Sequence, residues 1–430
     1  GYIYLTPMEA DTQRGNKGSN VIMEDILTQH LRKINKIDFR GRQYEFSNSN
    51  ISKAVQEIKN FPLKDGLIIT NEKVYDLITL GKSFEENIQG EVKSFTLHYI
   101  DWTNLKNNVF HVTEEFPVQR ISKTETYRPD LVLFVNGIPL VVIECKSPNV
   151  KTEEGKKPVD QAVSQQIRNQ LFDDGIPQLY IYTQLLLGLA VSDGVYGTTG
   201  SSAEYWAHWK EEFQSKADEA KYNAPLSELK NAPLSKEQKD KLFSDRFKYV
   251  RQHFDKMEKN TIEVTEQDKI LYNLCRPERL IELTFRFIIY ENHVKKVPRY
   301  QQYFGVKKTV ERVKYLENGK RKGGVIWHTQ GSGKSLTMAM LAKSLALEPA
   351  IPNPKILLVT DRVDLDDQIY KTFKNCGKEV EQATTGNHLI DLLQDNKDHI
   401  ITTVINKFEK AAKKEGVKIC LLYTSPSPRD

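Results

Sequence analysis

Cysteine is scarce in this chain: four occur among 430 residues, and they lie far apart. Cys145, Cys275, Cys376 and Cys420 form no C-x-x-C pair, so the sequence predicts neither a zinc site nor a disulfide framework. We therefore expect reduced thiols, as in cytoplasmic proteins.

Long hydrophobic runs are also missing. No window approaches 18 consecutive apolar residues, so no membrane span is expected, and the N-terminus has no apolar core of a secretory signal. Neither sign of charge dominates, since 62 basic and 57 acidic residues leave a net charge of +5. This mild balance permits nucleic-acid binding without arguing for it. We expect a cytoplasmic protein that does not bind a membrane.

The chain is too long for one ordinary domain. Hydrophobic residues make up 39% and charged residues 28% of the sequence, which is typical of soluble globular proteins. A prior of roughly 150 residues per domain predicts two or three domains. From changes in composition we place a first domain at 1–200, a polar helical connector at 201–295 and a third region at 296–419.

The last eleven residues, 420–430, follow a strand-like stretch without any structural transition. Back-translated in one reading frame, they resemble an adapter used in sequencing-library preparation; the alternative is a genuine Ser/Pro-rich tail. We exclude them from the predicted fold. The natural sequence is then expected to end near Ile419, inside a domain, with further motifs missing.

Hydrophobic periodicity predicts helices and strands throughout the first domain. Helices are expected within 21–34 and at 159–172. Short β elements are expected within 66–80 and 92–100, with a helix between or beside them. Strands are expected at 109–118, 131–135, 138–145 and 178–183, and 185–191 is predicted as a strand or a buried helix.

The third region has the order of an α/β fold with a parallel sheet. Strands are expected at 324–328, 355–360 and 399–405, and helices at 336–347 and 365–373.

Two apolar runs flank Asn136-Gly137, which is a frequent two-residue hairpin turn. Alternate residues of a strand share a face, so Glu144 and Lys146 lie on one side of the second strand. The hairpin also returns Asp130, at the start of the first strand, to the end of the second. Two carboxylates and an ammonium group are therefore predicted to meet at one end of a β-ribbon.

This set of groups suits the hydrolysis of a phosphodiester. Carboxylate oxygens are preferred ligands of Mg²⁺, which polarises the phosphate and lowers the pKa of a bound water. Lys146 would position that water and stabilise developing negative charge. The competing interpretation is a surface hairpin with an ordinary Glu/Lys pair. Charged residues that end an otherwise apolar strand favour the site.

A glycine-rich motif, G-S-G-K-S, follows the strand predicted at 324–328 and precedes the helix predicted at 336–347. Backbone N–H groups of such a loop bind phosphate, its lysine reaches the outer phosphates of ATP, and its serine holds Mg²⁺. His328 stands where the full pattern has its first glycine, and a chance Gly/Ser loop is the alternative. The motif consists of Gly331, Ser332, Gly333, Lys334 and Ser335.

The string R-P-D-L-V-L-F-V-N-G-I-P-L-V-V-I-E-C-K at 128–146 resembles the PD-(D/E)XK nuclease core, and specifically the restriction subunit of type I restriction-modification enzymes. The segments at 108–112 and 116–119 are similar to the same family's approach to this core. The resemblance implies that Asp130 and Glu144 are metal ligands and that Lys146 is catalytic.

The family also carries a Q-x-x-x-Y element on the next helix. Gln166 matches its first position, with Gln170 in place of tyrosine, so the resemblance implies that Gln166 and its neighbour Arg168 contact DNA or order the site. Glu24, on the first predicted helix, would match the family's first acidic position. An exposed, solvated glutamate is the alternative.

The run T-Q-G-S-G-K-S at 329–335 resembles motif I of superfamily 2 helicases. The runs V-T-D-R-V-D-L-D-D-Q at 359–368 and T-V-I-N-K-F at 403–408 are similar to motifs Ia and Ib. R-Y-Q-Q-Y at 299–303 resembles an adenine-reading segment, which implies that Gln302 is the reader; a polar helix start is the alternative.

Together the motifs imply the N-terminal part of a type I restriction subunit: a PD-(D/E)XK domain with a mixed sheet flanked by helices, a helical connector and a truncated RecA-like lobe with a parallel sheet. Such a subunit joins methylation and specificity subunits, cuts unmodified double-stranded DNA with Mg²⁺ and translocates DNA with ATP. No Asp-Glu box is present, so this stretch is not expected to turn over ATP. The alternatives are a stand-alone nuclease–helicase of phage defence or repair, and a non-catalytic DNA-binding module.

Overall fold

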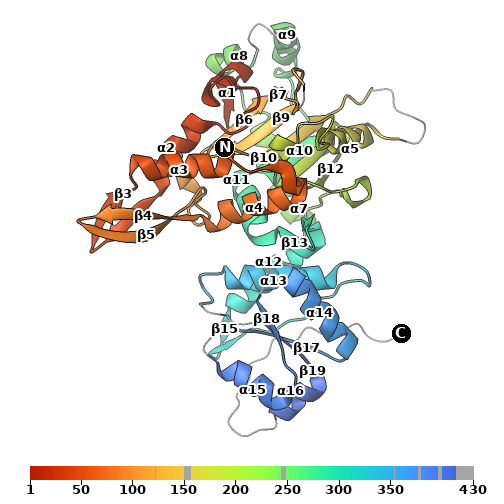
Figure 1. The fold of residues 1–430 in the computed structure, drawn as a ribbon. Helices are drawn as coiled ribbons and strands as arrows, with labels where there is room; N and C mark the ends of the chain where they lie inside the picture. Colours follow the sequence, from red (N-terminus) through yellow and green to blue (C-terminus); the bar gives the residue numbers. More distant parts are fainter. Residues whose placement is uncertain are drawn as a thin grey trace. The chain divides into compact units, whose positions relative to one another are not determined.

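The structure is a computed structural model that describes residues 1–121, 123–149, 156–243, 248–352, 354–375, 379–395 and 400–412. The predicted adapter segment at 420–430 and the end point at Ile419 lie outside the described residues. The chain divides into two compact units, Gly1–Glu282 and Leu283–Asp430, and each is described by itself (Figure 1).

A mixed six-stranded sheet forms the centre of the first unit. Its strands lie in the order β1-β6-β9-β10-β11-β12, with parallel pairing in β1/β6 and β10/β11 and antiparallel pairing elsewhere. The mixed α/β class predicted for this region is therefore confirmed. The strands are β1 (Ile3–Leu5), β6 (Phe110–Glu114), β9 (Leu131–Val135), β10 (Ile138–Cys145), β11 (Leu185–Ala190) and β12 (Asp193–Gly197).

The predicted hairpin at Asn136-Gly137 is confirmed as the turn between β9 and β10. Both residues have positive φ angles, 52° and 85°, which asparagine and glycine adopt more easily than other residues. The amide of Asn136 is buried and donates to the carbonyl of Tyr99 at 3.0 Å. A Cβ atom on Gly137 would lie 2.5 Å from the carbonyl oxygen of Met23, so the turn also needs glycine for space.

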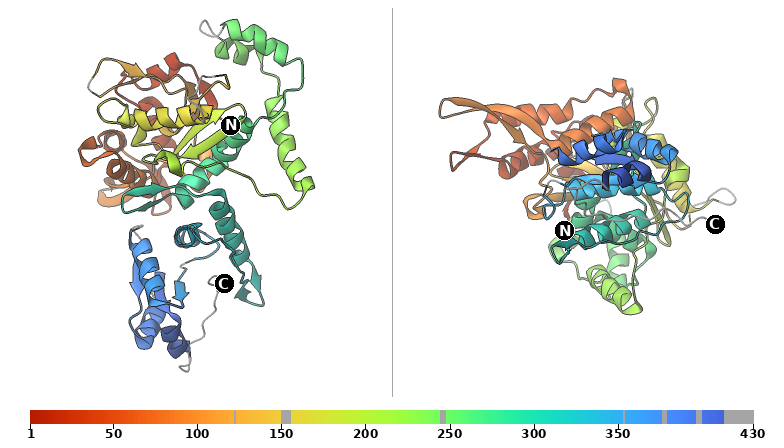
Figure 2. Two further views of the ribbon diagram at one scale, coloured as in Figure 1. Left: turned by 90° about the vertical axis from the view of Figure 1, so that its right-hand side faces the viewer. Right: turned by 90° about the horizontal axis from the view of Figure 1, so that it is seen from below.

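Helices and three small strand pairs complete the first part of this unit, and α5 lies along one face of β10 and β11 (Figure 2). The helices are α1 (Pro7–Gln13), α2 (Glu24–Ile34), α3 (Asn48–Lys59), α4 (Leu67–Leu80), α5 (Pro158–Asn169) and α6 (Pro177–Tyr180). The paired strands are β2 (Lys36–Phe39) with β3 (Arg42–Glu45), β4 (Lys82–Ile88) with β5 (Glu91–Leu97), and β7 (Val118–Gln119) with β8 (Thr126–Tyr127).

Two predicted strands of the first unit are wrong. The segment at 66–80 is helix α4, because its buried residues recur at helical spacing, among them Asn71, Val74 and Ile78. The segment at 178–183 is the end of α6 and a turn. Its carbonyl groups receive hydrogen bonds from the buried Asn71 amide, at 2.8 to 3.1 Å, instead of from a neighbouring strand.

Helices dominate the end of the first unit. Part of this stretch packs on the sheet: Ala207 pairs with Tyr196 of β12, and Ile270 lies against Gly194. The domain limits at 200 and 295 stay a prediction. The helices are α7 (Lys216–Lys230), α8 (Lys236–Leu242), α9 (Lys248–Met257), α10 (Glu266–Cys275) and α11 (Pro277–Glu282).

The second unit contains a parallel three-stranded sheet in the order β17-β19-β18. The strands are β17 (Ile356–Thr360), β18 (Val380–Gln382) and β19 (Ile400–Val404); the helices are α12 (Tyr300–Lys314), α13 (Lys334–Ala346), α14 (Val363–Asn375), α15 (Gly386–Gln394) and α16 (Ile405–Ala412). The unit also has a π-helical turn at Leu283–Phe287 and the hairpins β13 (Ile289–Glu291) with β14 (Val294–Lys296) and β15 (Leu316–Glu317) with β16 (Lys320–Arg321).

The strand predicted at 324–328 is wrong, because the structure describes this segment without regular secondary structure. A strand needs a hydrogen-bonding neighbour, and none of the strands described in this unit pairs with it. Val325 and Trp327 are accordingly 71% and 75% exposed.

Candidate active site

Asp130 and Glu144 meet at the open end of the β9–β10 hairpin. Leu131 pairs with Ile143, so the residues just beyond this pair lie next to each other. The carboxylate of Asp130 accepts a hydrogen bond from the backbone N–H of Cys145 at 2.6 Å. Glu144 is fully buried. The main chain of β10 therefore holds the first carboxylate beside the second.

Lys146 completes the group predicted from the sequence. Its ammonium nitrogen lies 3.9 Å from Oε2 of Glu144, and its side chain is 19% exposed. Its backbone N–H donates to the carbonyl of Leu189 on β11 at 2.8 Å. The structure thus brings Asp130, Glu144 and Lys146 to one corner of the sheet, and their chemical roles stay a prediction.

Gln165 of α5 connects two members of this group, and the sequence analysis missed it. Its side-chain N–H donates to Oε2 of Glu144 at 2.8 Å, while its carbonyl oxygen accepts from Nζ of Lys146 at 2.7 Å. The amide therefore holds the carboxylate and the ammonium group in fixed positions. Its only signal in the sequence is its position next to Gln166, the residue that matches the family's motif.

Gln166 has different partners. It is fully buried, and its amide donates to the carbonyls of Val142 at 3.1 Å and Leu187 at 3.3 Å. Its carbonyl oxygen accepts from the hydroxyl of Tyr180 at 2.9 Å. Successive residues of a helix point about 100° apart, which explains why neighbouring glutamines differ. Gln166 connects two strands with α6 and does not contact the carboxylates.

Burial and a neighbouring carboxylate both act on the ionisation of Glu144. Burial, and to a lesser extent the neighbouring Asp130 carboxylate, raise the pKa of Glu144 to about 8, against the opposing charges of Lys146 and Arg168. Oε1 of Glu144 is buried without a hydrogen-bond partner. Burial also raises the pKa of Cys145 to about 12, so its side chain is a neutral thiol.

The donor set fits a divalent metal ion. Two adjacent carboxylates, one with an oxygen that lacks a partner, would both be satisfied by a cation between them. Mg²⁺ binds through one or two carboxylates and keeps several waters, so it needs no larger cluster. Among the residues that the structure describes, no three or more His, Cys, Asp or Glu side chains form a group that could hold a metal ion.

Glu24 is not brought to this corner. Its carboxylate pairs with Nζ of Lys59 at 2.5 Å. The backbone N–H of Met23, one residue before α2, donates to the carbonyl of Gly137 at 2.9 Å, which fixes the start of α2 at the turn. The five residues of β9 separate this turn from Asp130 by about 17 Å, so the start of α2 lies at the opposite end of the hairpin from the carboxylates.

The glycine-rich loop of the second unit, at residues 331–333, leads directly into α13. Gly331 and Gly333 have φ angles of 75° and 79°, and α13 starts at Lys334 without a side-chain cap. The hydroxyl of Ser332 donates to the carbonyl of Thr329 at 2.7 Å. A loop of this kind followed by an uncapped helix start presents N–H groups to an anion. The helix begins two residues earlier than the predicted start at 336, so Lys334 and Ser335 lie in its first turn.

Gln302 contacts this loop. It lies in the first turn of α12, is 5% exposed, and its side-chain N–H groups lie 3.4 Å and 3.3 Å from the carbonyl oxygens of Ser332 and Gly333. Its own carbonyl oxygen accepts from the backbone N–H of Arg299 at 2.8 Å. Both ends of the amide are therefore engaged, and the predicted role in reading adenine stays untested.

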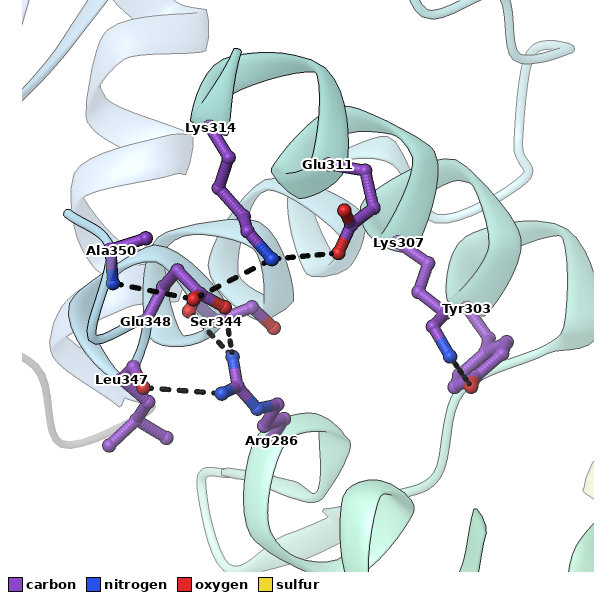
Figure 3. Close-up of polar contacts among 9 residues, drawn as sticks. All are labelled: Arg286, Tyr303, Lys307, Glu311, Lys314, Ser344, Leu347, Glu348 and Ala350. Atoms are coloured by element: carbon purple, nitrogen blue, oxygen red, sulfur yellow. Dashed lines mark hydrogen bonds and ion pairs between the residues drawn. The ribbon is translucent and has the colours of Figure 1, made fainter. Parts of the chain in front are cut away.

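Basic side chains hold the other end of α13 (Figure 3). The guanidinium of Arg286 donates to the carbonyls of Ser344 and Leu347 at 3.2 and 3.3 Å. Glu348 pairs with Arg286 at 3.3 Å and with Lys314 of α12 at 3.8 Å. Positive charge at the C-terminus of a helix is favourable, so Arg286 stabilises the C-terminal end of α13. The glycine-rich loop lies at the opposite, N-terminal end of the same helix.

Comparisons with known proteins agree with this division. Residues 1–205 match the family described as type I restriction enzyme R protein N terminus, and residues 301–425 match the SWI2/SNF2 ATPase family. The chain is 29% identical over 406 residues to the type I restriction enzyme HindI endonuclease subunit of Haemophilus influenzae, with 91% of this chain and 33% of that protein covered. A Methanocaldococcus jannaschii protein, provisionally named type I restriction enzyme MjaIXP endonuclease subunit, is 31% identical over 353 residues, with 79% and 30% covered.

These matches define a chain that joins a restriction-enzyme N-terminal domain to a domain of an ATPase family. The chain belongs to the type I restriction enzyme R protein family, and the resemblance predicted from the sequence is confirmed. It spans about a third of the length of the curated relatives it matches. In the residues that the structure describes, no helix is long and apolar enough to cross a membrane.

Proposed function

We propose that this chain is the N-terminal part of the restriction subunit of a type I restriction-modification enzyme. Its first unit is a PD-(D/E)XK-type domain that cuts double-stranded DNA, and its second is the first RecA-like lobe of an ATP-driven DNA translocase. The observation that carries the proposal is the corner where Asp130, Glu144, Lys146 and Gln165 meet.

In this proposal Asp130 and Glu144 would hold Mg²⁺, and the ion when bound would lower the pKa of a water and polarise the phosphate. The residues of the chain do the rest. Gln165 fixes the ammonium group of Lys146 beside Glu144, with hydrogen bonds of 2.7 and 2.8 Å. Lys146 then has a defined place from which to orient the water and to stabilise negative charge on the phosphate.

The second unit would supply the energy-consuming part. Lys334 would reach the outer phosphates of ATP, Ser335 would hold Mg²⁺, and the loop N–H groups would bind phosphate oxygens. In the complete enzyme the chain would assemble with methylation and specificity subunits in the cytoplasm. Sequence choice would then belong to the specificity subunit, and the contacts of this chain to DNA would be mostly to phosphate.

The experiment that tests this proposal is Lys146→Ala in the complete subunit, assembled with its partner subunits. We expect DNA cleavage to be abolished and DNA-stimulated ATP hydrolysis to remain, because the two sites lie in separate units. The control is Lys64→Ala, which removes an exposed lysine of the same unit. Wild-type cleavage by the Lys146 variant would show that the nuclease assignment is wrong.

A further inference from the structure

The helices α8 and α9 form a pair at the outer edge of the first unit, beside α1 (Figure 1). Nζ of Lys241 on α8 lies 2.8 Å from the carboxylate of Glu9 on α1. The rings of Phe243 and Phe254 pack against each other, with their centres 5.1 Å apart. The structure describes all ten residues of α9, and none of them is buried. The pair is therefore attached to the unit through α8, while α9 stays open to solvent.

The carboxylates at the end of α9 are engaged by α8. Nζ of Lys239, whose side chain is 16% exposed, pairs with the carboxylate of Asp255 at 3.1 Å and also with that of Glu258, one residue after α9. In the opposite direction, Asp240 of α8 pairs with Arg251 of α9 at 2.7 Å. The negative charges of Asp255 and Glu258 are therefore compensated inside the helical pair and do not offset the cations on the outer side of α9.

The outer face of α9 is polar, aromatic and basic, and none of its residues is acidic. Tyr249, Gln252, His253 and Lys256 follow one another at intervals of three and four, so they share one side of the helix. All four are exposed, Tyr249 to 79%, and the exposed Lys248 stands one residue before them. Within the described part of the chain, none of these five side chains has a hydrogen-bond or ion-pair partner. We call these five residues the α9 face.

We infer that the α9 face binds the sugar–phosphate backbone of duplex DNA without reading its sequence. This inference rests on the proposed function, which makes duplex DNA the substrate. Phosphate contacts come from lysine, glutamine and tyrosine side chains, and the α9 face offers all three side by side. Its positive charge complements the phosphates. A protein partner fits less well, because lysine is depleted in protein interfaces and the face has a single large aromatic ring.

The test uses the complete subunit assembled with its partner subunits, and two linear duplexes, one with and one without the recognition site. Binding is measured without ATP over a range of KCl concentrations. We expect the double variant Lys248→Ala/Lys256→Ala to bind both duplexes about 10-fold more weakly at the same KCl concentration. The slope of log affinity against log KCl concentration should fall by about 2, because two phosphate contacts are lost. Tyr249→Ala should weaken binding less and leave the slope unchanged, because the ring carries no charge. The control is Lys216→Ala, which removes an exposed lysine of α7.

Wild-type affinity and salt slope in the double variant would overturn the inference, and so would weaker binding that comes with a lower melting temperature. Loss of affinity for only the duplex with the recognition site would also overturn it, because phosphate contacts act on every sequence alike. Weaker assembly with the partner subunits, at unchanged DNA affinity of the assembled enzyme, would assign the α9 face to a protein contact instead. Lys146→Ala is measured alongside: unchanged cleavage by this variant refutes the proposed function, whereas the salt slope of the double variant decides on the α9 face alone.

Discussion

The two candidate sites differ in how their residues are brought together. In the first unit, Asp130, Glu144 and Gln165 come from separate parts of the chain and meet through strand pairing and helix packing. In the second unit, the five residues of the candidate site are consecutive: a loop with two positive φ angles followed by the start of α13. The first site thus needs the packing of α5 on a hairpin for its complete set of contacts, whereas the second is largely local.

This difference predicts different responses to mutation. The residues of the first site contact neighbours that also stabilise the fold. A mutation there will therefore often lower both activity and stability, and only at some positions will it lower activity alone. A residue of the loop has fewer structural duties, so its loss should affect nucleotide binding with little effect on folding.

The largest expected effect is that of Lys334→Ala. The variant should lose ATP hydrolysis by about 100-fold or more, since the lysine would compensate charge on the outer phosphates, and it should also lose the cleavage that depends on translocation. Thermal melting should be unchanged. Lys320→Ala, which removes a lysine on β16, is the control. Translocation by the Lys334 variant would contradict the assignment of the loop.

The next effect is the pH dependence of the first unit. Glu144 has a folded pKa of about 8, above its ordinary value of 4.5. Its contribution to the free energy of unfolding is therefore fully present below about pH 4.5 and is lost as pH rises towards and through 8. Without divalent cations, the loss should reach about 5 kcal/mol.

Denaturant unfolding of wild type and Glu144→Gln from pH 5 to pH 9 measures this loss. The variant has no titrating carboxyl at this position, so its stability should fall less steeply with pH. Identical pH profiles would show that the carboxyl is not held in its neutral form.

A smaller effect should separate the two neighbouring glutamines. Gln165→Ala should slow cleavage by about 10-fold with little change in stability, because its amide positions Lys146. Gln166→Ala should lower the free energy of unfolding by about 2 kcal/mol, because it leaves the buried Tyr180 hydroxyl without its acceptor. The reverse pattern, with cleavage lost only in the Gln166 variant and stability lost only in the other, would mean that the roles are exchanged.

The smallest expected effect is that of Gln302→Ala. Its amide lies 3.3 to 3.4 Å from the loop carbonyls, so we expect ATP and GTP binding to weaken together by about 5-fold. Nucleotide titration of the variant decides the point. A selective loss of ATP binding, with GTP binding unchanged, would instead assign Gln302 to the adenine base.

Local patterns were sufficient for the hairpin and for the corner it creates. Asn136-Gly137 predicts its own turn, and strand alternation then places Glu144 and Lys146 near Asp130 without further information. The phosphate loop is likewise readable from consecutive residues.

Features that depend on packing were not predictable in this way. Choosing Gln165 over Gln166 requires the rotation of α5 on the sheet, which no local pattern contains. The helix at Leu67–Leu80 was mistaken for β structure because its apolar residues, several of them β-branched, also suit a strand. The segment at 324–328 has a strand-like composition, but a strand also needs a neighbouring strand to pair with, and its own residues do not reveal whether one is present.

The anchor of Asp130 is a main-chain amide, which has a consequence for protein engineering. Every amino acid except proline provides the N–H that Cys145 donates at 2.6 Å, so the identity of that side chain is chemically interchangeable. Serine or alanine at this position would leave the aspartate tethered. The thiol at Cys145 can therefore be removed without loss of the hydrogen bond that anchors the aspartate, which protects this corner from reagents that modify thiols.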